Sequence, residues 1–437
     1  MELIVVKSNF QCFKKYITGI SSEAETRLRS YLRVLSHPDS CVETNIQRGR
    51  QMKSIIPILI SDVELQACLA LRSVIQYIKS LRDEDDVVLL DANQYNNYDI
   101  FCWIQALRGK AKGLNPVEKY KLYHYDIPML YFPRYDIYFY ADFGYDQYFG
   151  EQDKNKRICR FCHKSGATIF GNPKNSHAIS LFLGNQTLYC LEECKDCNNT
   201  FGKTIENALA SYYQYYRAAE HRKSRNGKPL MAKGFNYEQS ADGGLHIFQH
   251  EPVESALHVG ESIPEEGLKI ELNNSEPVVL HDIYRVLVKY VLACLPSALI
   301  PNFRIAADWV SGKKHPRKGT LPPIYRNETM DEVATPFLCV YIRRDSRKDL
   351  PYCVGELYFL ENLYVFAIPY CKGYDVMNSY LSNPLAHFVE KRYSDIQFTI
   401  ENYCDDIPRM VTNHVLLEGG KDAVLEPFST IDNKKQL

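Results

Sequence analysis

Two pairs of cysteines are the residues in this sequence whose spacing a specific chemistry would require. Cys159 and Cys162 form one Cys-x-x-Cys pair, and Cys194 and Cys197 form another. Each pair places two thiolates on one tight turn, and two such turns complete a tetrahedral site for zinc. Because four thiolates leave no position open for water, the metal would be structural. The sequence therefore predicts a structural Zn²⁺ bound by these four cysteines.

The alternative is that the four cysteines are unrelated reduced thiols, but two regularly spaced pairs favour the metal. His163 and Cys190 lie close enough in the sequence to be spare ligands. The cysteines outside the two pairs stand singly in mostly apolar surroundings, which favours buried small hydrophobic side chains. They are Cys12, Cys41, Cys68, Cys102, Cys190, Cys294, Cys339, Cys353, Cys371 and Cys404.

Between and just after the cysteine pairs, a histidine and an asparagine have the chemistry to hydrolyse a phosphodiester. His177 lies in the strand-like run Ser-His-Ala-Ile-Ser, and Asn198 follows the last cysteine where a helix is expected to start. A neutral imidazole at the end of a strand can take a proton from water. An oxygen ligand that faces it from a helix start can hold Mg²⁺ beside a scissile phosphate. A lone histidine is more often an ordinary surface or core residue. The hypothesis therefore depends on His177 occurring together with Asn198 beside the cysteine pairs.

This stretch resembles the HNH endonucleases of the ββα-metal fold, in the branch that has zinc-binding cysteines and Asn in place of the final His. The motifs are Cys-x-x-Cys, Ser-His-Ala-Ile, Leu183-Gly-Asn185 and Cys-x-x-Cys-Asn-Asn-x-Phe-Gly-x-x-Ile-Glu206. Phage endonucleases that resolve branched DNA have a similar layout. The resemblance covers about 50 residues of the chain.

The resemblance implies a role for each of four residues. His177 would be the general base, and Asn198 would bind the catalytic Mg²⁺ or Mn²⁺. Asn185 would steady the loop that carries the histidine. Glu206 would either support the site or only cap its helix and form an ion pair. One departure is Ser176, because the family commonly has an aspartate before the histidine, and a hydroxyl brings no charge to a Mg²⁺ ion.

Three functions therefore compete. The first is a metal-dependent endonuclease that hydrolyses DNA, with RNA left open as a substrate, and His177 with Asn198 favours it. The second is a catalytically inert, zinc-stabilised scaffold that binds nucleic acid or protein, and Ser176 favours it. In the third, the cysteines form only a zinc ribbon for protein contacts.

A basic loop after the expected helix 204–220 is the candidate contact for phosphates. Its residues are Arg222, Lys223, Arg225 and Lys228, and a second basic loop covers 313–318. The alternative for both loops is a solvated charged surface. The aromatic-rich stretch 120–149 resembles a platform for stacking bases. Lys and Arg are sparse there and aspartates outnumber them, so packing in a core or a protein interface is the favoured interpretation.

Length and changes in composition predict an α+β protein in three parts. A mixed α/β region at 1–152 and an α+β region at 236–437, both of unknown role, flank the ββα-metal core at 153–235. A capping box at Ser22 begins one expected helix. Apolar periodicity predicts further helices at 63–78, with a cap at Ser61 or Asp62, and at 100–107, 204–220 and 279–295. Expected strands are 87–90, 337–342, 355–360 and 363–368.

The chain has 437 residues, a formal net charge of −1, 45% hydrophobic and 24% charged residues. These values are typical of a soluble globular protein and exclude a chain that is basic throughout. No apolar run reaches about 18 residues, so no transmembrane helix is expected. The first residues lack the features of a signal peptide, so we expect a cytoplasmic protein with reduced cysteines. By analogy, the flanking regions suit a protein partner or a second copy, and a role in restriction or antiviral defence.

Overall fold

A computed structural model of the chain describes most of its residues and divides them into two compact units. The first unit is 1–198 with 287–402, and the second is 199–286 with 403–437. The described residues are 1–7, 12–36, 45–95, 97–108, 114–121, 124, 134–143, 145–213, 231–232, 235–239, 245–249, 268–273, 277–313, 321–328, 333–346, 350–360, 362–371, 384–393, 396–404, 406–410 and 412–417.

The N-terminal part of the first unit is built on a four-stranded antiparallel sheet in the order β2-β1-β4-β3. The strands are β1 (Glu2–Lys7), β2 (Cys12–Tyr16), β3 (Gln47–Arg48) and β4 (Asp86–Asp91). The helices are α1 (Ser22–Leu32), α2 (Gly49–Ser61), α3 (Val63–Ala67), α4 (Leu69–Ser80), α5 (Asn97–Arg108) and α6 (Pro116–Lys121).

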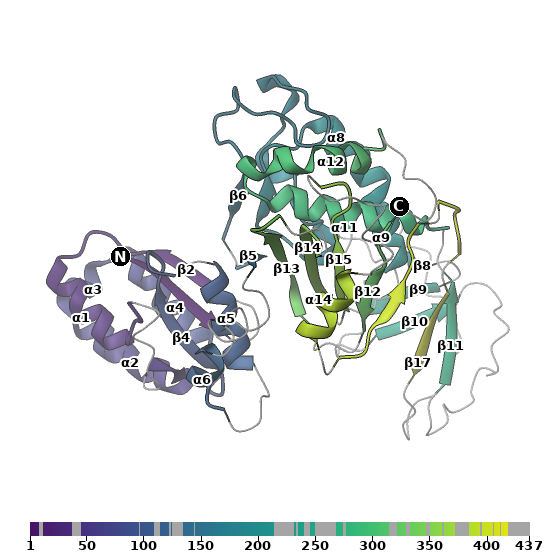
Figure 1. Ribbon diagram of the computed structural model, residues 1–437. Helices are drawn as coiled ribbons and strands as arrows, with labels where there is room; N and C mark the ends of the chain where they lie inside the picture. The colour runs from purple at the N-terminus through teal and green to yellow at the C-terminus, as the bar shows by residue number, and fades with distance from the viewer. Residues whose placement is uncertain are drawn as a thin grey trace, which may run out of the picture. The chain divides into compact units, whose positions relative to one another are not determined.

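Helices cover both faces of this sheet, as Figure 1 shows. Successive residues of a strand point to opposite faces. In β1, Leu3 and Val5 pack with α1 to α4, whereas Ile4 and Val6 pack with α5 and α6. Burial on both faces explains why the sequence of β4 is a continuous apolar run rather than an alternating one. The predicted strand 87–90 and helix 100–107 are confirmed.

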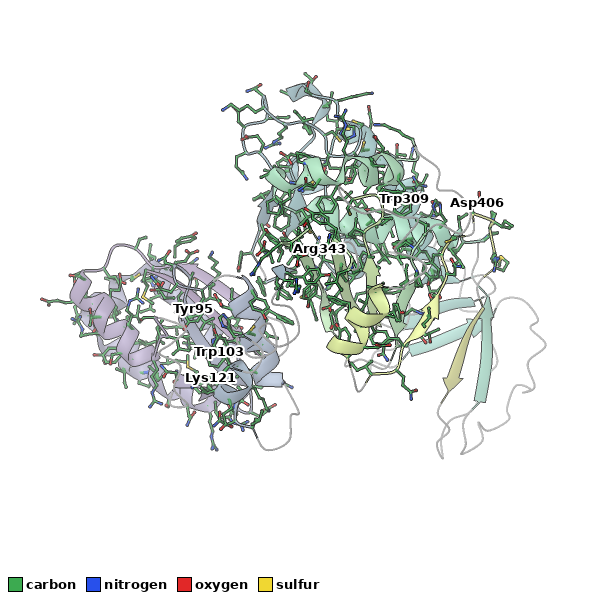
Figure 2. The ribbon with its side chains drawn as sticks, in the orientation of Figure 1. Tyr95, Trp103, Lys121, Trp309, Arg343 and Asp406 are labelled. Carbon is green, nitrogen blue, oxygen red and sulfur yellow. The ribbon has the colours of Figure 1, made fainter. Side chains whose placement is uncertain are left out.

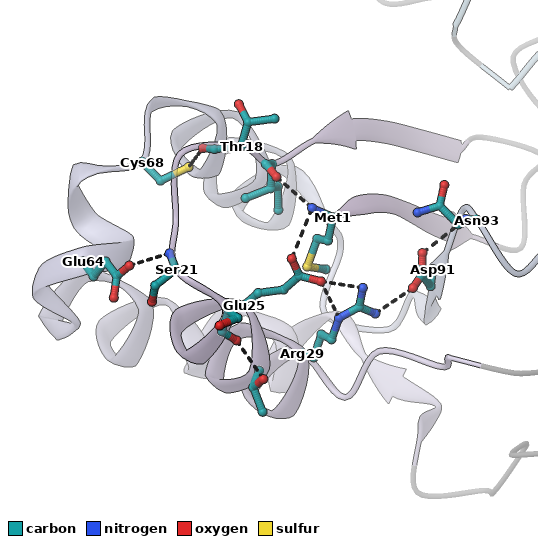
Figure 3. Close-up of polar contacts among 12 residues, drawn as sticks. Met1, Thr18, Ser21, Glu25, Arg29, Glu64, Cys68, Asp91 and Asn93 are labelled. Atoms are coloured by element: carbon teal, nitrogen blue, oxygen red, sulfur yellow. Dashed lines mark hydrogen bonds and ion pairs between the residues drawn. The ribbon is translucent and has the colours of Figure 1, made fainter.

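The structure moves the cap of one predicted helix by one residue and divides another predicted helix into two. The cap of α1 is Ser21 rather than Ser22, because the Ser21 hydroxyl accepts a hydrogen bond from the Ala24 N–H at 3.1 Å. The predicted cap at Asp62 is confirmed, but the predicted helix 63–78 is two helices that meet at the extended residue Cys68. In Figure 3 the Cys68 thiol donates to the Thr18 carbonyl oxygen at 3.6 Å, which ties this break to the end of β2.

A six-stranded antiparallel sheet forms the second core of the first unit, in the order β16-β12-β15-β14-β13-β5. Its strands are β5 (Tyr135–Ala141), β12 (Ile324–Asn327), β13 (Val333–Arg343), β14 (Cys353–Leu360), β15 (Asn362–Ala367) and β16 (Thr399–Glu401). Helix α14 (Pro384–Arg392) packs on it through Phe388 and Val389. The predicted strands at 337–342, 355–360 and 363–368 correspond to β13, β14 and β15.

The described part of the aromatic-rich stretch packs mostly in this core. Phe139 of β5 stacks on Phe101 of α5 with ring centroids 4.2 Å apart. Tyr120, Tyr135 and Phe143 are buried as well, whereas Tyr148 is partly exposed. The core interpretation of the aromatic residues is therefore confirmed for these four buried side chains. In Figure 2, Trp103 and Tyr95 mark the N-terminal side of the same apolar cluster.

The remaining elements of the first unit surround the cysteines. They are β6 (Gln147–Phe149), β7 (Leu188–Cys190), α8 (Lys195–Lys203), α11 (Leu280–Cys294) and α12 (Arg304–Val310). Short 3-10 turns cover Ala167–Ile169, Pro173–Asn175, Leu181–Leu183 and Ser297–Phe303. Both α8 and α11 continue into the second unit. The predicted helix 279–295 is confirmed as α11, and Pro296 follows its end.

Among the described residues, the second unit contains two small sheets and helix α9 besides the parts of α8 and α11 that extend into it. The strands β8 (Met231–Ala232), β9 (Phe235–Gln239) and β10 (Leu245–Gln249) form an antiparallel sheet, and β11 (Leu268–Asn273) pairs with β17 (Thr412–Leu417). Helix α9 spans Ile205–Tyr212, within the predicted helix 204–220, whose last residues lie outside the described part. The α+β expectation is thus confirmed for the chain.

Candidate metal centre

The four cysteines of the two pairs come together in one group. Their sulfur atoms all lie within 4.8 Å of one another. The Sγ atoms of Cys159 and Cys197 are 3.8 Å apart, and those of Cys162 and Cys194 are 3.6 Å apart. Three of the four side chains are buried and Cys162 is half-buried. This group is compatible with a structural metal site.

The first cysteine turn is held by its own backbone and by a left-handed residue. The N–H of Cys159 donates to the carbonyl oxygen of Lys164 at 2.9 Å, and the N–H of His163 donates to that of Cys159 at 3.0 Å. His163 has a φ of 62°, a conformation uncommon outside glycine, and it reverses the chain directly after Cys162. The second pair lies at the beginning of α8, so a turn and a helix start provide the two halves of the group.

The two spare ligands lie outside this group. The imidazole Nε2 of His163 is 3.0 Å from the Asp308 carboxylate of α12. Cys190 is buried in β7, and burial raises the pKa of its thiol to about 11. Among the described residues, the four paired cysteines are the group with metal-binding geometry.

The Cys194 thiol resists ionisation when the other thiols are its neighbours. Hydrogen bonding to Cys159, followed by burial, raises the pKa of the Cys194 thiol well above its ordinary range. A bound cation reverses this preference because it stabilises thiolates directly. A metal ion would therefore stabilise these four closely spaced sulfurs as thiolates.

His177 lies on a strand-like piece that pairs with β7. It forms an antiparallel bridge with Tyr189, and the N–H of Ala178 donates to Leu188 at 2.9 Å. The N–H of Cys190 donates back to the Ser176 carbonyl oxygen at 2.8 Å. The imidazole is half-buried, with its centroid 5.2 Å from that of the Tyr189 ring. On its other edge β7 pairs in parallel with β6.

This region contains a bridge, a three-residue strand and a helix, and a complete ββα-metal core is not shown. The 3-10 turns Pro173–Asn175 and Leu181–Leu183 on either side of His177 limit the pairing to a few residues. The predicted strand at His177 is therefore reduced to one bridge, because the chain turns away before a second pair forms.

Asn185 closes the loop between His177 and β7. Its buried amide group donates to the carbonyl oxygens of Ile179 at 2.5 Å and Leu188 at 3.1 Å. Its Oδ1 accepts from the N–H groups of Thr187 and Leu188 at 3.1 and 2.9 Å. One side chain thus pairs backbone groups at both ends of the loop, which is a common use of asparagine in irregular segments.

The other predicted residues have different surroundings. Asn198 is half-buried in α8, with its N–H bonded to the Cys194 carbonyl oxygen at 3.0 Å. The buried Ser176 hydroxyl is 3.5 Å from the Glu193 carbonyl oxygen. Glu206 is half-buried in the first turn of α9 and belongs to the second unit. The basic residues Arg222, Lys223, Arg225 and Lys228 lie outside the described residues.

Buried charges next to the cysteine turns are residues that the sequence reasoning missed. Arg160 is 2% exposed, pairs with Glu192 at 2.8 Å, and donates from Nη1 to carbonyl oxygens at the end of α11. Gly150 makes room for the Glu192 side chain, because an added Cβ would lie 2.8 Å from its Cγ. Lys289 of α11 also reaches this region. The available signal was an arginine inside the first cysteine turn, two glutamates directly before the second turn, and a single lysine within an apolar helix.

No protein-family model, curated protein or solved structure matches this chain. Within the described part, no helix combines the length and the apolar character that crossing a bilayer requires. The interpretation of the site therefore depends on its own residues and geometry.

Proposed function

We propose that this chain is a metal-dependent endonuclease of the HNH type that hydrolyses phosphodiester bonds in DNA. The observation that carries the proposal is the grouping of four thiols from two distant turns, with His177 on the segment between them and Asn198 directly after the last cysteine. Restriction or antiviral defence as its role, and the cytoplasm as its location, stay predictions.

Zinc is the metal that we assign to the four-cysteine group. With Zn–S bonds of about 2.3 Å, a tetrahedral site separates its sulfur atoms by about 3.8 Å. The two closest pairs are 3.8 and 3.6 Å apart. Binding would contribute on the order of 10 kcal/mol to folding a segment with little regular structure. Since four thiolates complete the coordination, this ion has no place for water or substrate.

Catalysis would then fall to His177 and Asn198. The half-buried imidazole would take a proton from the attacking water as general base. The Asn198 side-chain oxygen would bind a Mg²⁺ or Mn²⁺ ion, which when bound stabilises the charge on the leaving oxygen. Asn185 would hold the histidine loop, and Glu206 would add an acidic group at the following helix. The basic loop from Arg222 to Lys228 would contact DNA phosphates.

One observation favours a second function, an inert zinc-stabilised scaffold. Ser176 is buried, and its hydroxyl points to the Glu193 carbonyl oxygen, where the family commonly has a carboxylate for the catalytic ion. Without that charge the site would bind Mg²⁺ weakly. In this alternative the same fold binds nucleic acid or protein without cutting.

The test is incubation of the purified full-length protein with duplex, single-stranded and branched DNA and with RNA, with and without Mg²⁺ or Mn²⁺. We expect metal-dependent cleavage that falls about 10²–10⁴-fold in His177→Ala. Asn198→Ala should also lose activity, whereas the matched control Asn199→Ala, at an exposed neighbour on α8, should keep it. Undiminished cleavage by His177→Ala would contradict the assignment of His177 as the general base. If zinc-loaded protein cleaves no substrate, the inert scaffold is the favoured function.

A further inference from the structure

A buried lysine of α11 contacts the backbone of the histidine. The Nζ of Lys289 donates to the carbonyl oxygen of His177 at 2.8 Å and lies 3.2 Å from a carboxylate oxygen of Glu193. The side chains of Lys289 and Glu193 are both 0% exposed. Removing two charges from water costs several kcal/mol for each ion, so burying this pair has a large desolvation cost.

The direction of the His177 carbonyl explains why a donor is needed there. In its bridge with Tyr189, His177 occupies the position whose own N–H and C=O point away from the partner strand, because Ser176 and Ala178 make the hydrogen bonds. An unpaired buried carbonyl would cost free energy. The Lys289 ammonium supplies the hydrogen bond that a third strand would otherwise supply.

The next residue of α11 contacts the same strand-like piece. The Tyr290 hydroxyl donates to Ser180 Oγ at 2.7 Å, so consecutive residues of the helix hold both ends of the piece 177–180. Glu193, the partner of Lys289, directly precedes the metal-group residue Cys194. One ammonium group therefore links the histidine-bearing piece to the second cysteine turn.

We propose that Lys289 is a positioning residue for His177. By fixing the carbonyl group of His177, it fixes the peptide plane and hence the direction from which the imidazole leaves the backbone. The kinetic part of this proposal rests on the proposed nuclease function, whereas its structural part does not. Misplacement of a catalytic group by about 1 Å can cost about 10²-fold in rate.

The variants must separate positioning from the cost of an unpaired buried charge. Lys289→Met alone would leave the Glu193 carboxylate without this partner, so the main variant is Lys289→Met combined with Glu193→Gln. Removing both members of a buried pair is often neutral for stability. Lys289→Arg is the conservative variant, because it keeps a positive donor. Lys7→Met combined with Asp85→Asn is the matched control, since Lys7 and Asp85 form another largely buried ion pair, at 2.8 Å, that belongs to the N-terminal sheet and does not contact His177.

The measurements on full-length protein are zinc content, kcat and KM for cleavage, the NMR shifts of the His177 ring, and hydrogen exchange of the Ala178 amide. For the double variant we expect retained zinc, a kcat about 10²-fold lower, a nearly unchanged KM, a shifted His177 ring signal and faster Ala178 exchange. Lys289→Arg should recover most of the rate, and the control Lys7→Met with Asp85→Asn should resemble the wild type in zinc content, rate and His177 signal.

The proposal is overturned if the double variant keeps zinc, kcat, the His177 ring signal and Ala178 exchange as in the wild type. If the wild type cleaves no substrate, the proposed function fails, and the NMR signal and the exchange rate still decide whether Lys289 positions His177. A shifted signal with faster exchange then supports the proposal, and unchanged values of both contradict it.

Discussion

The metal segment 157–198 and the N-terminal sheet are stabilised in opposite ways. The sheet has hydrogen-bonded strands of up to six residues with helices on both faces, and its stability comes from apolar side chains in two clusters. The metal segment has 3-10 turns, two isolated bridges and a three-residue strand, and side chains form hydrogen bonds with many of its backbone groups. Where a segment is too short to build a core, point contacts such as Asn185 and a metal group replace apolar burial.

Removing the metal should have the largest effect and should be confined to one of the two regions. In Cys194→Ser, or after treatment with a chelator, we expect lost zinc and fast hydrogen exchange across the metal segment. The loss of stabilisation is on the order of 10 kcal/mol, while β1 and β4 keep their protection. Peptide-resolved exchange with metal analysis measures both. Cys190→Ala is the matched control, and an equal loss of zinc in this variant would contradict the four-cysteine assignment.

Truncation of a core side chain should give the converse result. Trp103 is 0% exposed and stacks on Tyr120 with centroids 4.4 Å apart. Trp103→Ala should destabilise the N-terminal part by about 3–5 kcal/mol, through lost apolar burial and the cavity that remains. Chemical denaturation with exchange read on β1 and α5 measures this change, together with zinc content. A drop in zinc content would show that the two regions are not separately stabilised.

A smaller effect is expected where one side chain replaces a strand ladder. Asn185→Ala should cost about 1–3 kcal/mol, because two carbonyl groups and two N–H groups lose their partner. Hydrogen exchange at Leu188 and Thr187 is the direct measurement. The control is Asn172→Ala, which removes a cap at an exposed position. Equal protection in both variants would mean that Asn185 does not hold the loop.

The two regions also differ in what the sequence could predict. Periodicity predicted α1, α5, β4 and β13 to β15, and cysteine spacing predicted the grouping of the four cysteines, because both signals are local. Short elements such as β3 and β16 have no such signal and were not predicted. The break at Cys68 was missed because the apolar positions continue in helical spacing across it. Arg160 and Lys289 were missed because their partners lie 132 and 112 residues away in the sequence. No local pattern encodes contacts of that separation.

The central claim is that the four thiols build the fold while His177 and Asn198 perform the chemistry. The most direct measurement determines zinc content and the cleavage rate in the same preparations of wild type, His177→Ala and Cys194→Ser. The account predicts about one zinc per chain and a rate lower by about 10²–10⁴-fold in His177→Ala, with both zinc and activity lost in Cys194→Ser. Cleavage at the wild-type rate by zinc-loaded His177→Ala would contradict the claim that His177 performs the chemistry.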